Sequence, residues 1–183
     1  MARMPSVPPS LPPPPAAINF FLELPIGPEW QNVDLLRLAI LSCLAAVFGD
    51  QDLSESVGIV TSELLENAIK YGDWTRKERP YLTLSVRGTT DEVRVEVASP
   101  VASASAHYAN VKKTIDWIQK FGSAREAYLA RMHAIADNDD VTGESRMGLV
   151  RIAYEGPCAI DARLGDGEVL YVSAAIPTVN RVS

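Results

Sequence analysis

Glu63 and Asn67 are the residues whose types and spacing best fit a chemical role. They lie in TSELLENAIKYG, residues 61–72, a stretch with helical periodicity that has Gly72 as its stop signal. Residues four apart share one face of a helix, so the carboxylate and the carboxamide stack one turn apart. A carboxamide oxygen is a Mg²⁺ ligand, and a carboxylate orients or deprotonates an attacking hydroxyl. The alternative is a solvated helix face without chemistry.

The helix around this pair divides into a polar stripe and an apolar arc. The stripe occupies one side of a helical wheel and consists of Ser56, Glu63, Glu66, Asn67 and Lys70. The adjacent arc is expected to pack on the sheet and consists of Leu53, Val57, Val60, Leu64, Ala68 and Tyr71. Glu63 and Asn67 are therefore expected where the core meets solvent.

Hydrophobic periodicity predicts the elements that position this helix. Strands are predicted from Ile18 to the next proline, at 81–88 and 92–99 as a hairpin, and at 158–164 and 168–177 as a second hairpin. Helices are predicted at 28–48, from about Asp52 to just before Gly72, and at 146–155, with a helical insert at about 105–136. This order predicts an α+β fold, a two-layer sandwich with helices on one face of a mostly antiparallel, mixed sheet.

The first 16 residues differ from the rest because proline dominates them. Proline fixes φ and removes a backbone donor, so we predict a disordered tail at 1–16 and one domain over 17–183. A Pro-rich docking site is the functional alternative for this tail.

Composition excludes several classes of function. The net charge is -6, from 17 Lys and Arg against 23 Asp and Glu, which argues against nucleic-acid binding. The longest apolar run is shorter than a membrane span and contains Arg37, and no secretory signal is evident, so we expect a cytoplasmic protein without membrane insertion. Cys43 and Cys158 are isolated and are predicted to be reduced core residues.

The helix at 61–72 resembles the N-box of the GHKL (histidine kinase-like) ATPases. The family pattern S-E-x-x-x-N-A-x-x-x-G is matched by Ser62, Glu63, Asn67, Ala68 and Gly72. Within that superfamily the chain looks most similar to the bacterial anti-sigma factor serine kinases of the SpoIIAB and RsbW type. The order of the other elements and the box ESRMGLVRIAYEG, residues 144–156, extend the resemblance from about Leu24 to Ile176.

Two boxes depart from the family pattern. Ser99 stands where the family has the Asp of D-x-G-x-G, which binds the adenine amino group, and the glycines that follow are absent. Arg146 and Gly148 occupy the two glycine positions of the second box, S-G-x-G. The helical insert takes the place of the ATP lid, and we expect it to cover the nucleotide side of the sheet.

The resemblance implies a regulatory protein of a partner-switching system. Glu63 would be the catalytic base and Asn67 the Mg²⁺ ligand, while Asn67, Lys70, Ser99, Arg146 and Gly148 would hold ATP. The expected partner is a STAS-domain antagonist or a sigma factor, and a homodimer is left open. The activity would be serine/threonine phosphorylation of the partner. The alternative is a degenerate, non-catalytic binding module that no longer binds nucleotide.

Overall fold

The computed structural model describes residues 19–78, 80–102, 104–136 and 147–178 of the 183-residue chain. The predicted tail at 1–16 and Arg146 lie outside these described residues. The elements follow in the order β1 (Asn19–Ile26), α1 (Gln31–Phe48), α2 (Gln51–Tyr71), β2 (Leu82–Thr89), β3 (Glu92–Pro100), α3 (Ala104–Ile118), α4 (Ala124–Ala136), α5 (Met147–Glu155), β4 (Ala159–Gly165) and β5 (Val169–Pro177).

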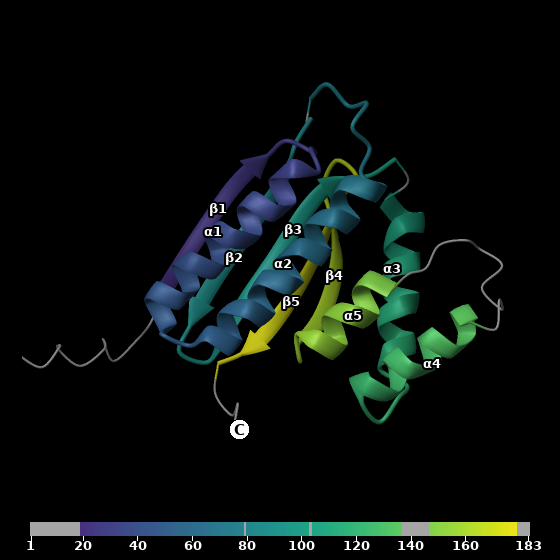
Figure 1. Cartoon of the computed structure of the whole chain (residues 1–183). Helices are drawn as coiled ribbons and strands as arrows, with labels where there is room; N and C mark the ends of the chain where they lie inside the picture. The colour runs from purple at the N-terminus through teal and green to yellow at the C-terminus, as the bar shows by residue number, and fades with distance from the viewer. Residues whose placement is uncertain (1–18, 79, 103, 137–146, 179–183) are drawn as a thin grey trace, which may run out of the picture.

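The sheet has five strands in the order β1-β2-β3-β5-β4 (Figure 1). Both predicted hairpins are present, β2 with β3 and β4 with β5. All four pairings between described strands are antiparallel, so the mixed character expected from the sequence is not found among them. Strand side chains alternate between faces. The helix-facing side of the central strands is buried and apolar, with Leu82, Leu84, Val86, Val93, Val95 and Val97 at its centre.

α1 and α2 lie side by side over one face of this sheet (Figure 1). The backbone N–H of Leu53 donates to the Asp50 carboxylate at 2.9 Å, which caps α2, and the helix ends before Gly72 as predicted. The predicted apolar arc of α2 is buried against the sheet except for Tyr71, which is partly exposed. Leu65 and Ile69 lie outside that arc and are also buried, because α1 covers the flank of α2.

α1 is a surface helix with a large exposed apolar side. It buries three residues, Val33, Ile40 and Leu44, while Leu35 and Leu38 are 64% and 59% exposed. By length and composition alone, α1 is the one described helix that could cross a membrane, with a mean hydropathy of 1.5. The buried residues instead pack α1 against the rest of the domain.

The two cysteines do not share the core environment predicted for them. Cys43 lies on the exposed side of α1, so the prediction is wrong for this residue. The apolar run of α1 gives no clear polar side, and its periodicity therefore did not show which residues face solvent. Cys158 is partly buried, and this burial raises its pKa to about 12.

The predicted helical insert forms α3 and α4. α3 packs across β4, β5 and α5, and Ile115 is its buried anchor. α4 packs on α5, where the rings of Tyr128 and Tyr154 stack with their centroids 4.7 Å apart. α3 and α5 therefore cover the part of the sheet that α1 and α2 leave open (Figure 1).

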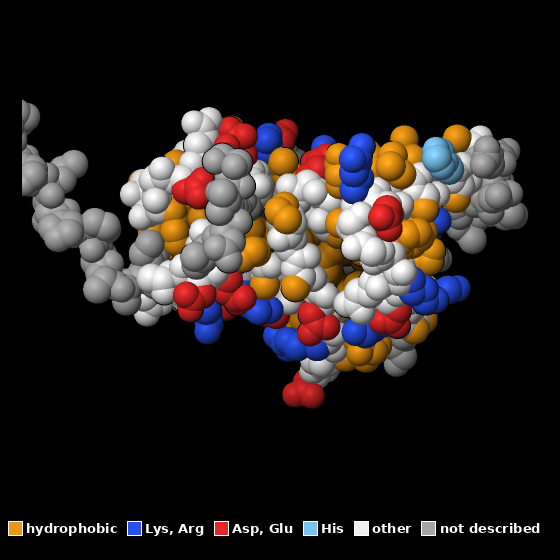
Figure 2. Space-filling view, turned by 90° about the horizontal axis from the view of Figure 1, so that it is seen from below, with side chains coloured by type: hydrophobic (Ala, Val, Ile, Leu, Met, Phe, Trp, Pro, Cys, Tyr) orange, Lys and Arg blue, Asp and Glu red, His pale blue; other side chains and the backbone are white. Residues whose placement is uncertain are grey.

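The charged side chains are interspersed over the face of the molecule seen from below (Figure 2). Among the coloured residues of this face, Lys and Arg alternate with Asp and Glu and do not gather into a broad basic area (Figure 2). Binding to a phosphate backbone requires a basic face. The visible face is therefore unlike a nucleic-acid interface.

Candidate functional site

Glu63 and Asn67 lie on the side of α2 that faces α5, at the border of the core. Both are half-buried, whereas Leu64 and Ala68 beside them are buried. α5 packs directly on α2. The predicted stacking of a carboxylate and a carboxamide on one helix face is thus present, and the face is covered by a second helix rather than by solvent alone.

Gly148, near the start of α5, makes this close packing possible. A Cβ atom built on Gly148 would lie 2.9 Å from Asn67 Nδ2, 3.1 Å from Glu63 Oε2 and 3.2 Å from Asn67 Oδ1. Any larger residue would therefore press on both side chains. The structure brings together Glu63, Asn67 and Gly148, which come from two motifs that are far apart in the sequence.

Glu63 forms an ion pair with Arg151 of α5. Arg151 Nη1 donates to Glu63 Oε1 at 2.9 Å, and Arg151 Nε donates to Glu155 Oε1 at 3.0 Å. The Glu63 side chain is only 12% exposed. Burial raises the pKa of Glu63, Arg151 opposes this rise, and the nearby carboxylates of Glu66 and Glu155 add to it. The carboxyl group is thus easier to protonate than a free glutamate.

A cavity of ≈ 150 Å³ opens beside Asn67. Its walls come from α2, the end of β3, α3, the start of α5 and the start of β5. Most of the lining is apolar, including Val97, Val101, Leu170 and Val172. None of the described lining residues is Asp, Glu, Lys or Arg. The cavity therefore suits an uncharged, largely apolar group.

Polar side chains around this cavity have unused hydrogen-bonding capacity. Within the described part of the chain, no hydrogen-bond partner is found for the side chains of Asn67, Ser99, His107 and Asn110, all of which line the cavity. Ser99 is only 6% exposed. Buried polar groups are normally hydrogen-bonded, so an unpartnered hydroxyl in a cavity wall indicates a place for a ligand or a water molecule.

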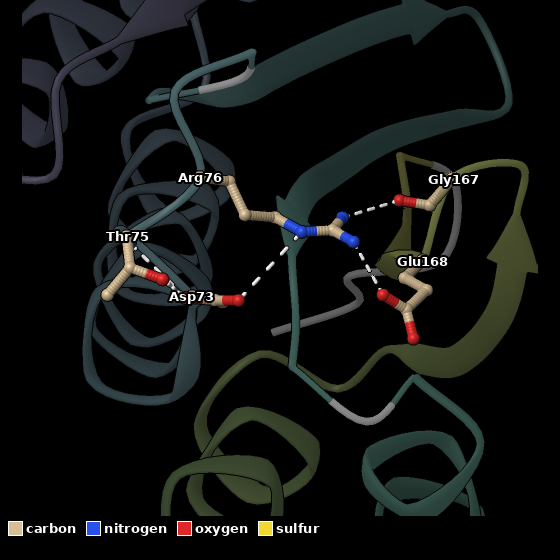
Figure 3. Close-up of polar contacts among 5 residues, drawn as sticks. All are labelled: Asp73, Thr75, Arg76, Gly167 and Glu168. Carbon is tan, nitrogen blue, oxygen red and sulfur yellow. Dashed lines mark hydrogen bonds and ion pairs between the residues drawn. The ribbon is translucent and has the colours of Figure 1, made fainter.

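A polar cluster joins the loop after α2 to the β4–β5 turn (Figure 3). Arg76 donates to the Gly167 carbonyl at 2.7 Å and to Glu168 Oε2 at 2.5 Å. Asp73 accepts from the Thr75 hydroxyl at 2.6 Å and lies 3.8 Å from Arg76. Gly167 and Glu168 both have positive φ, which is unfavourable for a glutamate, and Arg76 holds the turn in this conformation.

The other site residues predicted from sequence have different outcomes. Ser99 and Gly148 line the cavity together with Asn67. Lys70 lies on the exposed side of α2, with its ammonium 4.9 Å from the centroid of the Tyr71 ring, and is not among the described lining residues. Arg146 lies outside the described residues.

Sequence reasoning missed Arg151, His107 and Asn110 as site residues. Arg151 is 88 residues from Glu63, and no local spacing pattern connects them. His107 and Asn110 lie on α3, in the insert that the family resemblance does not cover. The three-residue spacing of His107 and Asn110 places both on one face of a helix, which was the one available signal.

The described residues fit a magnesium nucleotide. The Asn67 carboxamide is free of described partners and lies beside Glu63, and both side chains pack against Gly148 at the start of α5. The uncharged cavity next to it suits the base of a nucleotide, and Asn67 would supply one oxygen ligand to Mg²⁺. Among the described residues, no group of three or more His, Cys, Asp or Glu forms a metal site of its own.

This architecture defines a two-layer α/β sandwich with a cavity between its helices and the end of its sheet. Among solved structures, a similar fold occurs in a chain of the SiaB–SiaC complex from Pseudomonas aeruginosa, with a TM-score of 0.62 and 16% identity. The match covers 85% of this chain and 88% of that chain. At this identity the likeness shows the fold alone. The sequence matches no protein-family model and no curated protein.

Proposed function

We propose that this protein is a cytoplasmic regulatory domain that binds a magnesium nucleotide in the cavity beside Asn67 and acts on a protein partner. The observation that carries the proposal is the position of Asn67. Its carboxamide, for which no hydrogen-bond partner is found among the described residues, lies between the uncharged cavity and the carboxylate of Glu63, and both side chains pack against Gly148. The partner would be a STAS-domain antagonist or a sigma factor, in a partner-switching system.

Each residue of the site has a defined task in this proposal. Asn67 holds Mg²⁺, and the bound nucleotide supplies the phosphoryl group. Glu63 accepts the proton of a Ser or Thr hydroxyl on the partner, because its raised pKa brings it closer to the pH at which a general base works well. The similarity to a chain of a two-protein complex supports a protein partner.

A non-catalytic binding module is the second candidate. Two observations favour it: Ser99 offers no carboxylate at the end of β3, and Arg151 occupies the carboxylate of Glu63. In that case the cavity would be retained without phosphoryl transfer, and the surfaces of α3 and α4 would contact the partner.

Two substitutions separate binding from chemistry. Asn67→Ala removes the magnesium ligand and should weaken MgATP binding steeply. Glu63→Gln keeps the shape of the side chain but removes the base, so it should spare binding and slow phosphoryl transfer to a STAS-domain partner by roughly 10²- to 10⁴-fold. Glu55→Gln, at an exposed position of the same helix, is the matched control and should change neither quantity.

The outcomes distinguish the two candidates. Binding that depends on Asn67 without any transfer that depends on Glu63 would favour a nucleotide-binding module without catalysis. A wild-type protein that binds no MgATP at millimolar concentration would contradict the proposal, whether or not a partner is present.

A further inference from the structure

We propose that α3 and the end of β3 read the ring of the bound nucleotide, and that this site accepts adenine and guanine about equally. The inference rests on the nucleotide-binding function proposed above and adds the substrate range of the same cavity. It concerns Ser99, His107 and Asn110, polar side chains that line the cavity from β3 and α3.

The shape and charge of the cavity select a planar neutral ring. An apolar cavity of about this volume admits a molecule the size of benzene. Here the volume is ≈ 150 Å³, and the cavity is partly open, so a second fused ring can extend beyond it. Since none of the described lining residues is Asp, Glu, Lys or Arg, the charged phosphates must lie outside, toward Asn67 and the start of α5.

The polar groups that face this ring come mainly from the insert. Ser99 ends the inner face of β3, and its register partner Leu170 closes the cavity from β5. His107 and Asn110 of α3 line the cavity, and the ring centroid of His107 lies 6.3 Å from that of Tyr71 on α2. α3 also contributes Thr114, whose hydroxyl donates to the backbone carbonyl of Asn110 at 3.0 Å, while no partner for the Asn110 carboxamide is found among the described residues.

These side chains can donate as well as accept hydrogen bonds. A hydroxyl, a carboxamide and a neutral imidazole each offer both a donor and an acceptor, whereas a carboxylate only accepts. The 6-amino group of adenine needs an acceptor, and the 6-oxo group of guanine needs a donor. A site without a carboxylate can satisfy either ring by rotating the Ser99 hydroxyl or turning the Asn110 amide. Neither ring then leaves a polar group of the site unpaired, so neither ring is rejected.

Calorimetric titration of the full-length protein with MgATP and with MgGTP tests this inference. The wild type should bind both nucleotides with dissociation constants within about tenfold of each other. Asn110→Ala should weaken both by roughly 2- to 10-fold, the scale of one lost hydrogen bond. Asn110→Asp introduces an obligate acceptor and should favour MgATP over MgGTP by about tenfold or more.

Two further variants test whether the position of the added carboxylate matters. Ala109→Asp places the same charge at the adjacent exposed position of α3, outside the cavity, and should leave the ratio of the two affinities unchanged. Ser99→Asp should shift the ratio as Asn110→Asp does, but Ser99 is buried, so thermal unfolding must first show that this variant folds.

Each negative result would contradict a different claim. If the wild type binds neither nucleotide, the proposed function itself is wrong. If the wild type binds MgATP more than 100-fold tighter than MgGTP, or if Asn110→Ala leaves both affinities unchanged, nucleotide binding stands and this inference is overturned.

Discussion

Glu63 is the proposed base of this site, but its carboxylate already contacts α5. Arg151 Nη1 donates to its Oε1 atom, while Oε2 faces the position that a side chain at residue 148 would fill. Both oxygens are thus engaged by or turned toward α5. A hydroxyl that gives its proton to Oε1 must displace Arg151, so α5 controls access to the carboxylate. A solvated helix face, the alternative drawn from sequence, would show neither contact.

The raised pKa of Glu63 predicts how stability depends on pH. Burial raises this pKa in the folded protein above the usual 4.5, so the folded state takes up a proton at a higher pH than the unfolded chain. The resulting stabilisation is complete below about pH 4.5 and is lost as the pH rises through the folded pKa. The melting temperature of the wild type relative to Glu63→Gln should therefore increase as the pH is lowered from 8 toward 4.5.

Thermal unfolding of the two proteins across this pH range measures the effect directly. Glu55→Gln serves as the control, because Glu55 is exposed on the same helix and is not among the carboxylates that raise the pKa of Glu63. A constant difference between the wild type and Glu63→Gln at every pH would mean that Glu63 titrates alike in the folded and unfolded states.

The elements of the fold differ in how firmly they are held. α2 buries ten residues between the sheet and its neighbouring helices, whereas α4 buries one, Ala127. Local opening costs less where fewer apolar contacts are broken. Amide hydrogen exchange should therefore be faster in α3 and α4 than in α2, and the difference should be largest for α4.

A bound nucleotide should change this order. If α3 lines the binding cavity, saturating MgATP should slow exchange in α3 more than in α1, which lies away from the cavity. Equal protection of α2, α3 and α4 in the free protein would instead make the insert an integral part of the core.

Sequence patterns predicted the elements well because each pattern depends on local spacing. The alternation in β2 and β3, the periodicity of α2 and its stop at Gly72 all reflect burial on one face of the element. The patterns could not show that Leu65 and Ile69 are buried, since this follows from the packing of α1 beside α2. They also could not place Cys43, because α1 is apolar on its exposed side as well.

The candidate site was predictable in part for the same reason. Glu63 and Asn67 share one helix, so their spacing alone indicated a common face. Arg151 and Asn110 reach the site through tertiary packing of α5 and α3, and no sequence distance encodes that packing. The family pattern supplied Ser99 and Gly148, and the structure places both at the cavity with Asn67.

At the scale of the whole molecule, the two faces of the sheet have different roles. The helix-covered face contains the core and the cavity. The opposite face carries charged and aromatic side chains that contact each other, as in the Arg163–Glu96 ion pair and the packing of Arg163 on Tyr171. A magnesium nucleotide should therefore bind only at the helix-covered face of the sheet.

Chemical-shift mapping of the full-length, ¹⁵N-labelled protein during titration with MgATP tests the central claim most directly. The account predicts saturable shifts that centre on the amides of Asn67, Ser99, Asn110 and Gly148, while the amides of Arg94 and Arg163 on the opposite face stay unchanged. An absence of shifts at millimolar MgATP, or shifts confined to the opposite face, would contradict the account.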